Sequence, residues 1–487
     1  MPPTFRSRTI SGVSWSLTSQ LVRQALTVIV GIVLARLLSP QEFGLVAMVM
    51  VIGNFALLIA ELGLGAGLVQ RREVNEAHFS SVFWLNLLVG LALTGLFAAG
   101  APLVAAFYGE PRLEPLTLAL SFLFLLRALT VVPQARLARA LDFRGLAIAD
   151  IAAALIAGGL AIGLALTDHG VWSLVTRLLT AAGASAVLIF ILARWRPRPA
   201  VSGAALKQLL GFGGSLFASE SLGYWSRNLD NLLIGRVLGT APLGLYSRAY
   251  ELMLYPLQNV SQAIGRVMFP ALSQIQDQPE RVKRVHLRVT RVVALLTFPM
   301  CLGLLVVAEP FVLALFGEQW RGMIPVLQIL CAIGAPQSIL TLNGNLYLSQ
   351  GRADLQLKVG LWLKGLLVVG IVIGVLTGEI LGVAACYAGA SLLCAYPSFY
   401  FAGRLVGLSF LEMLQNLGGV FLCAALMAGA AFAAGRLLLA DFAPLTRLLA
   451  QIAIGAALYP ALILLLRVEA FVDFKTLLLQ RLRGRDQ

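Results

Sequence analysis

Long apolar runs recur along the whole chain, and they constrain its fold more than any other feature. Each run holds about 20 to 28 residues, which is enough for an α-helix to cross a hydrocarbon core of about 30 Å. Hydrophobic residues make up 59% of the 487 residues and charged residues 12%, about half the charged share of a typical soluble domain. We therefore expect an all-α polytopic membrane protein.

The runs predict about fourteen transmembrane helices. They lie near residues 14–38, 43–69, 79–108, 113–135, 146–166, 170–193, 209–238, 243–271, 289–308, 325–350, 355–376, 380–406, 414–439 and 443–466. The segments between them are short and leave no room for a separate catalytic domain. Basic residues precede the first run, as in a signal peptide, but no small-residue cleavage site follows, so we expect this run to be retained.

The net charge of +14 is explained by membrane topology. Most of the 37 Lys and Arg residues fall on alternate loops and at both ends of the chain, for example Arg71, Arg139, Arg196 and Arg284. Because Lys and Arg concentrate on the cytoplasmic side, we expect a multi-pass protein of the bacterial inner membrane with both termini in the cytoplasm and an even number of spans. Anionic lipid headgroups are the expected charged partners, and nucleic acid is not.

The sequence repeats weakly at an offset of 200 residues. Residues 35–38 (Ala-Arg-Leu-Leu) align with residues 235–238 (Gly-Arg-Val-Leu), and Gly44 aligns with Gly244. Each copy places an Arg at the end of the first helix of a half and a Gly-Leu at the start of the second. Because an even number of spans separates the copies, they have the same orientation, which predicts parallel repeats related by a pseudo-two-fold axis along the membrane normal.

This symmetry predicts two six-helix lobes followed by two C-terminal helices. The expected divisions are 1–200 for the first lobe, 201–406 for the second, 407–468 for the last two helices and 469–487 for a cytoplasmic amphipathic tail. The lobes meet at the charged, proline-containing segment 194–199, which cannot continue a membrane helix.

Polar and charged residues gather on single faces of several spans, mainly the first two of each lobe. A charge at the bilayer centre costs about 2.5–3.5 kcal/mol on insertion scales, so it persists only where it is paired, snorkels or faces a water-filled cavity. We therefore predict a cationic substrate-binding cavity. Its candidate residues are Gln20, Arg23, Gln24, Tyr224, Arg227, Asn231, Gln262 and Arg266, and the candidates for ion coupling or an ion pair are Glu61, Glu220 and Asp230.

Structural alternatives stay open for these charges. Arg23 and Glu61 lie at similar depths and are compatible with a simple ion pair. Arg227 and Asp230 are three residues apart on one helix and are compatible with a local pair, while Arg266 is placed to snorkel to the headgroups. Three further charges are isolated on apolar spans and fit either a cavity wall or a packing pair: Arg127, Arg177 and Lys364.

The cysteines and histidines indicate neither a metal site nor disulfides. All five cysteines fall within apolar spans without CxxC spacing. The histidines His78, His169 and His286 are expected in separate loops, so they cannot form a zinc cluster. No cofactor is expected, although coupling to a proton or sodium gradient is compatible with the membrane carboxylates.

Five segments carry a resemblance to a known family. They are Ser-Gly-Val-Ser-Trp at 11–15, Leu-Ala-Arg-Leu-Leu-Ser-Pro-Gln-Glu-Phe-Gly-Leu at 34–45, Glu-Leu-Gly-Leu-Gly at 61–65, Asn-Leu-Asp-Asn-Leu-Leu-Ile-Gly-Arg at 228–236 and Gly-Leu-Tyr at 244–246. In these segments the chain resembles the Wzx-type lipid-linked oligosaccharide flippases of the multidrug/oligosaccharidyl-lipid/polysaccharide exporter superfamily.

The resemblance implies a V-shaped two-lobe fold that works by alternating access. Its cargo would be an undecaprenyl-pyrophosphate-linked oligosaccharide repeat unit, moved from the cytoplasmic to the periplasmic leaflet for exopolysaccharide, O-antigen or capsule synthesis. Family cavities are cationic, and Arg23 and Arg266 match them in helix and approximate depth, whereas Glu61 departs from a purely basic lobe. The implied partners are the lipid-linked sugar, membrane lipids, a polysaccharide polymerase and chain-length machinery.

Two other classes of function fit part of the pattern. A cation-coupled multidrug antiporter of the same superfamily would need an essential membrane carboxylate, with Glu61, Glu220 or Asp230 as candidates. A membrane glycosyltransferase or polymerase would need a long external loop or a cluster of acidic residues near the interface, and the sequence predicts neither. We therefore expect a transporter and not an enzyme.

Overall fold

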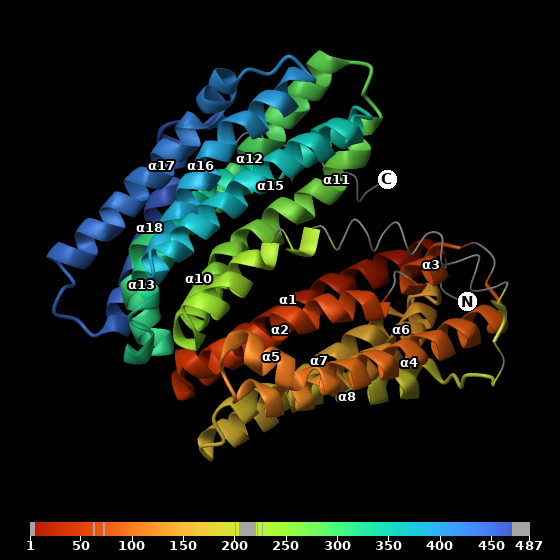
Figure 1. The fold of residues 1–487 in the computed structure, drawn as a ribbon. Helices are drawn as coiled ribbons and strands as arrows, with labels where there is room; N and C mark the ends of the chain where they lie inside the picture. The colour runs from red at the N-terminus through yellow and green to blue at the C-terminus, as the bar shows by residue number, and fades with distance from the viewer. Residues whose placement is uncertain are drawn as a thin grey trace. The chain divides into compact units, whose positions relative to one another are not determined.

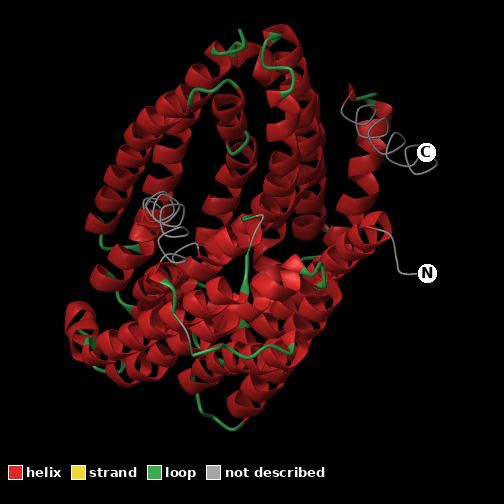
Figure 2. Ribbon diagram, turned by 90° about the vertical axis from the view of Figure 1, so that its right-hand side faces the viewer, coloured by secondary structure: helices red, strands yellow, loops and turns green. Residues whose placement is uncertain are grey.

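The computed structural model describes residues 5–61, 64–71, 74–199, 201–203, 221, 223–225 and 227–469. The elements within these ranges are helices, and Figure 2 shows no strand among them. The chain divides into two compact units, Met1–Gly244 and Leu245–Gln487. The expected boundaries at residues 200, 406 and 468 remain predictions, and the predicted tail from residue 470 onwards lies outside the described residues.

The first unit is a bundle of long helices (Figure 1). They are α1 (Phe5–Leu37), α2 (Pro40–Glu61), α3 (Leu64–Gln70), α4 (Glu76–Ala99), α5 (Ala101–Tyr108), α6 (Leu113–Arg139), α7 (Phe143–Leu166) and α8 (Val171–Ala193). A further helical stretch covers residues 227–237, and α10 (Thr240–Pro256) begins in this unit. The packed pairs include α1 with α7, α4 with α6, and α8 with both α6 and α7.

The second unit continues from α10 through a π-helical turn, Leu257–Ser261. Its helices are α11 (Gln262–Ser273), α12 (Pro279–Phe311), α13 (Met323–Leu340), α14 (Asn343–Ser349), α15 (Ala353–Leu376), α16 (Ile380–Arg404), α17 (Phe410–Leu437) and α18 (Pro444–Leu465). A second π-helical turn, Val312–Phe316, and a short 3-10 helix, Glu318–Trp320, join α12 to α13.

Eleven helices are long and apolar enough to cross a membrane within the described ranges, and each coincides with a predicted span. The three remaining predicted spans do not appear as single long apolar helices within the described ranges. The span at 14–38 lies in α1, whose polar side chains lower its hydropathy, and residues 209–220 of the span at 209–238 lie outside the described residues. The span at 243–271 is divided into α10, the π-helical turn and α11. The chain is a multi-pass helical membrane protein, and these elements are consistent with a count of fourteen.

The predicted repeat is visible in the helix boundaries. α1 ends at Leu37 and α2 begins at Pro40, while the second copy has its helical residues end at 237 and α10 begin at Thr240. In the first copy Ser39 and Glu42 form a capping box, because the Ser39 amide donates to the Glu42 carboxylate at 2.7 Å and the Glu42 amide donates to the Ser39 hydroxyl at 3.4 Å. Pro40 at the first helical position fits the same turn.

Within the first unit, the starts of α2 and α10 are in close backbone contact. A Cβ placed on Gly44 would lie 1.8 Å from the carbonyl oxygen of Thr240, and one on Gly244 would lie 1.9 Å from that of Pro40. Only glycine allows two helices to approach this closely. The repeated Gly-Leu of the sequence therefore marks a reciprocal helix crossing.

In the second unit, polar side chains attach α12 to its neighbours. Thr297 and Ser338 are hydrogen-bonded through their hydroxyls at 2.8 Å, which joins α12 to α13. Tyr459 of α18 donates to the Leu295 carbonyl at 2.8 Å, and Lys283 forms a 2.7 Å ion pair with Glu412 of α17. The two C-terminal helices therefore pack on α12 as part of this unit.

One expectation about α12 is wrong. The sequence predicts a loop at His286, but α12 begins at Pro279, ten residues before the apolar run, so His286 lies within this helix. The basic residues of this extension hid its helical period, since one face of it is apolar and packs inward. His286 is fully buried there. His78 also lies in a helix, in the capping box at the start of α4.

Candidate functional site

A cavity of about 200 Å³ opens between α1, α6, α7 and α8 of the first unit. The helix α7 provides its small-residue wall, because Ala153, Ala154 and Ala157 follow one another at helical spacing. A Cβ on the neighbouring Gly158 would lie 2.7 Å from Cγ2 of Val30, so α7 approaches α1 closely on this side. The lining residues are Arg23, Leu26, Thr27, Val30, Arg127, Asp150, Ala153, Ala154, Ala157, Arg177, Ala181 and Ser185.

Three arginines from three helices reach this cavity. Arg23 comes from α1, Arg127 from α6 and Arg177 from α8. The single carboxylate among the lining residues is Asp150 of α7, which lies close enough to attract the charges of Arg23 and Arg127. Arginine stays protonated in proteins, so the wall carries more positive than negative charge within a bundle of apolar helices.

This arrangement is suited to binding an anion. A guanidinium group presents several N–H donors in a fixed plane, which matches phosphate and carboxylate oxygens in a bidentate way. The Ser185 hydroxyl adds a neutral hydrogen-bonding group to the wall, whereas the Thr27 hydroxyl donates to the Arg23 carbonyl at 2.9 Å. The rest of the wall is apolar and consists of Leu26, Val30 and the alanines. These side chains lower the local dielectric constant, which strengthens electrostatic attraction.

Tyr224 has a structural contact in addition to any role in binding. Its hydroxyl donates to the carbonyl oxygen of Val51 in α2 at 2.6 Å, and its ring lies 5.8 Å from that of Phe55. Asn231 donates its backbone amide to the Asp230 carboxylate at 2.8 Å, and Asp230 is buried. Arg227 is exposed.

The remaining candidates are placed as follows. Gln20 is exposed and Gln24 half-buried on α1, and neither lines the cavity. The backbones of Gln262 and Arg266 belong to α11 and that of Glu61 ends α2, but their side chains lie outside the described part, as does Glu220. The binding and coupling roles predicted for these residues remain predictions.

Sequence reasoning missed Asp150 as a site residue. A signal was present, since Asp150 is a charge inside the apolar run 146–166, and Ala153, Ala154 and Ala157 follow it on one helical face. The sequence is compatible with a cavity or a packing role for the isolated charges Arg127 and Arg177, and both line the cavity.

The second unit holds a polar cluster between α10, α13 and α16. Gln337 donates to the Tyr387 hydroxyl at 3.1 Å and to the Ser391 hydroxyl at 3.2 Å, and Tyr250 lies 3.4 Å from Tyr387 between hydroxyl oxygens. These groups are neutral and partner one another. Among the described residues no group of His, Cys, Asp or Glu is arranged to hold a metal ion.

The fold defines the class of this protein as a polytopic helical membrane protein with the architecture of known transporters. The structure titled "Lipid II flippase MurJ, inward closed conformation" aligns with a TM-score of 0.72 at 14% identity, covering 92% of this chain and 98% of that one. Residues 33–325 match the family described as "Polysaccharide biosynthesis protein". The chain belongs to this family.

Two curated relatives agree with that membership. The "Teichuronic acid biosynthesis protein TuaB" of Bacillus subtilis is 28% identical over 98% of this chain and 99% of its own length. The "Succinoglycan biosynthesis transport protein ExoT" of Rhizobium meliloti is 33% identical over 68% of this chain and 67% of its own length. The family resemblance found in the sequence is confirmed.

Proposed function

We propose that this protein is a transporter that flips undecaprenyl-pyrophosphate-linked oligosaccharide repeat units from the cytoplasmic to the periplasmic leaflet by alternating access, for exopolysaccharide, O-antigen or capsule synthesis. The family membership and the transport function in the name of one relative support it. The structural observation that carries it is the cavity into which Arg23, Arg127 and Arg177 converge.

The cavity suits the charged part of such a cargo. A diphosphate carries its negative charge on oxygens that accept bidentate hydrogen bonds from guanidinium groups. The polyprenyl tail can remain in the bilayer while the diphosphate enters the protein. No covalent step is required, so we propose a transporter and not an enzyme.

The location and partners of the protein form part of the same proposal. The Lys and Arg distribution supports an inner-membrane position with both termini in the cytoplasm. Partners beyond the lipid-linked cargo would be a polysaccharide polymerase and chain-length machinery. Enzymatic reporters fused at each terminus and at the segment 109–112 test the orientation, since the termini and that segment are expected on opposite sides.

Because Asp150 lines the cavity, cation-coupled multidrug antiport is a second candidate function. Such an antiporter needs a carboxylate in the membrane region that binds the coupling cation, and Asp150 occupies a cavity inside the helix bundle. The arginine-rich wall disfavours a cationic drug, because like charges repel in a medium of low dielectric constant. Drug efflux and polymer export measured on the same Asp150→Asn strain separate the two functions.

The deciding experiment replaces Arg23 and Arg127 singly by Gln in the full-length protein. Loss of one charge-assisted hydrogen bond costs about 1.5–3 kcal/mol, so we expect flipping in proteoliposomes to fall by about tenfold to a hundredfold. Arg23→Lys keeps the charge and is expected to recover part of the rate. Arg112→Gln, at an exposed surface pair with Glu110, is the matched control. Wild-type flipping by both cavity variants, at equal protein levels, would refute the proposed phosphate site.

A further inference from the structure

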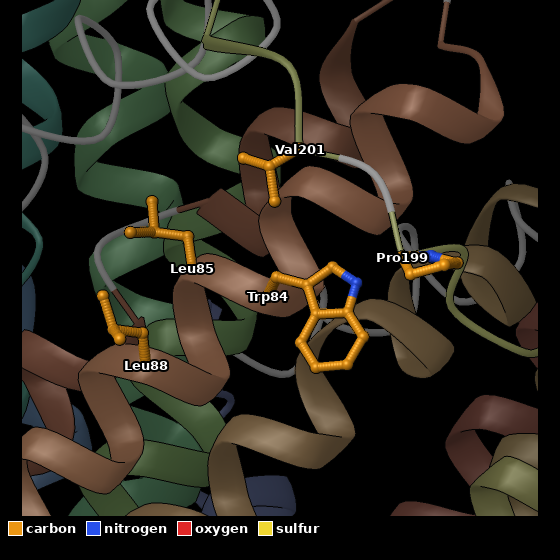
Figure 3. A pocket seen from close by; sticks show the side chains of 5 residues that line it. All are labelled: Trp84, Leu85, Leu88, Pro199 and Val201. Atoms are coloured by element: carbon orange, nitrogen blue, oxygen red, sulfur yellow. The ribbon is translucent and has the colours of Figure 1, made fainter.

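A second, mostly apolar groove lies on the outside of the first unit, where the segment after α8 crosses the start of α4. We call residues 194–199 and 201–203 the strap. The groove holds about 470 Å³ and is lined by Trp84, Leu85 and Leu88 of α4 and by Pro199 and Val201 of the strap (Figure 3). Its volume is within the range of roughly 300–1,000 Å³ that is usual for small-molecule sites.

The strap is fixed in place by hydrogen bonds to the first turns of α4. The Arg198 amide donates to the Ser80 hydroxyl at 3.0 Å, and the Ser202 amide donates to the Ser81 hydroxyl at 2.7 Å. The indole N–H of Trp84 donates to the Arg198 carbonyl at 2.7 Å. The groove is therefore a preformed feature of this unit.

A partly buried junction holds the N-terminal end of the strap. Trp195 is buried, and its indole N–H donates to a carboxylate oxygen of Glu76 at 2.9 Å. Arg136 pairs with the other oxygen of that carboxylate at 2.5 Å. Arg198 of the strap also attracts this carboxylate, so the Glu76 charge is matched by two guanidinium groups.

Three arginines of the strap precede the groove-lining residue Pro199 in the sequence. Arg194, Arg196 and Arg198 are exposed and lie within five residues of one another, next to the lining residue Pro199. Trp84 occupies the position of an interfacial aromatic residue, with an apolar ring and a polar N–H.

An apolar stripe on α4 leads away from these charges. Leu88, Leu91 and Leu96 are 66%, 51% and 70% exposed, at spacings that keep them on one side of the helix. In a membrane protein, such side chains contact acyl chains. The cationic strap is thus followed by the apolar groove and then by exposed leucines. An anionic phospholipid has the matching order, with a negatively charged headgroup followed by apolar acyl chains.

We infer that this groove is a binding site for an anionic phospholipid, such as phosphatidylglycerol. Its headgroup phosphate contacts the arginines of the strap, and an acyl chain lies over Trp84, Leu85 and Leu88. The inference is independent of the flipping proposal, since the groove shares no residue with the arginine cavity.

The test is native mass spectrometry of the full-length protein in detergent with equal amounts of phosphatidylglycerol and phosphatidylcholine. The wild type is expected to retain phosphatidylglycerol preferentially. The triple variant R194Q/R196Q/R198Q is expected to lose about fivefold in that preference for each arginine removed, and Leu88→Asn to retain less of both lipids. The matched control R281Q/R284Q/R404Q removes three exposed arginines from the second unit and should keep the wild-type preference.

Two outcomes would overturn the inference. One is an unchanged preference in the strap variant, which would show that these arginines do not bind the headgroup, or an equal loss in the control variant, which would leave net charge alone as the cause. The other is displacement of phosphatidylglycerol from the wild type, but not from Leu88→Asn, by undecaprenyl phosphate, which would assign the groove to the transported lipid. Unfolding midpoints in detergent, measured for all variants, identify any variant that has failed to fold.

Discussion

Gly44 and Gly244 each lie against the backbone of the helix that carries the other. A side-chain carbon on Gly44 would meet the Thr240 carbonyl oxygen at 1.8 Å, and one on Gly244 would meet the Pro40 carbonyl oxygen at 1.9 Å. The pairs 40 with 240 and 44 with 244 are equivalent positions of the repeat, so the contact is reciprocal.

Gly44→Ala and Gly244→Ala are each expected to be strongly destabilising. The obstructing atoms are backbone, which cannot rotate away, and overpacking of this kind costs about 1–3 kcal/mol or more. The measurement is the unfolding midpoint in detergent together with polymer export. Gly31→Ala is the control, because no atom lies within 4 Å of its Cβ position and Ala is favoured over Gly in a helix by about 0.5–1 kcal/mol. Equal midpoints for Gly31→Ala and Gly44→Ala would contradict the close crossing.

Anion binding at the arginine cavity should respond in opposite directions to two substitutions. Asp150→Asn removes the negative charge, so inorganic pyrophosphate is expected to raise the unfolding midpoint more than in the wild type. Arg127→Gln removes a positive charge and is expected to reduce that shift. Asp168→Asn, in an exposed turn with a positive φ of 58°, changes the same charge away from the cavity and should behave as the wild type. A pyrophosphate shift that is the same in all four proteins would argue against the cavity.

Glu76→Gln is expected to loosen the strap. The substitution removes the charge that holds both Arg136 and the Trp195 indole, and loss of a charged hydrogen-bond partner costs about 1.5–3 kcal/mol. Limited proteolysis near residue 199 should become faster and the unfolding midpoint should fall. Glu114→Gln, in the exposed first turn of α6, is the comparison. Unchanged proteolysis would mean that the serine hydrogen bonds alone hold the strap.

Ser39→Ala is expected to destabilise the turn between α1 and α2 by about 0.5–2 kcal/mol, because it removes the capping side chain. Ser39→Asp keeps an acceptor at the cap and is expected to recover most of the loss. The unfolding midpoint of each variant checks this, and equal values for the two would show that the capping box contributes nothing there.

The sequence pattern was sufficient to predict the helices and turns that depend on local chemistry. Apolar length predicted the spans that became α2, α4, α6 and the other long helices. The Ser39-Pro40-x-Glu42 segment specifies its own turn through capping. The repeat also predicted which loops and helix starts would be equivalent.

The cavity depended on information that local pattern does not hold. Arg23, Arg127 and Arg177 lie on three helices that are distant in sequence, and which faces of those helices meet is decided by small residues such as Gly158. A polar stripe on α1 showed that Arg23 needed a polar environment, but it did not point to Asp150. His286 was misplaced for a related reason, since the helix α12 continues past the apolar run on which the prediction relied.

The helix crossing at Gly44 can form only after both of its helices have been synthesised. Gly44 and Gly244 are 200 residues apart in the sequence, and ribosomes add roughly 5–20 residues per second. The face of α2 around Gly44 therefore waits roughly 10–40 s for its partner helix to be made. During that interval another small-residue helix can occupy the position, so cells that slow translation between the two repeats should accumulate misassembled protein.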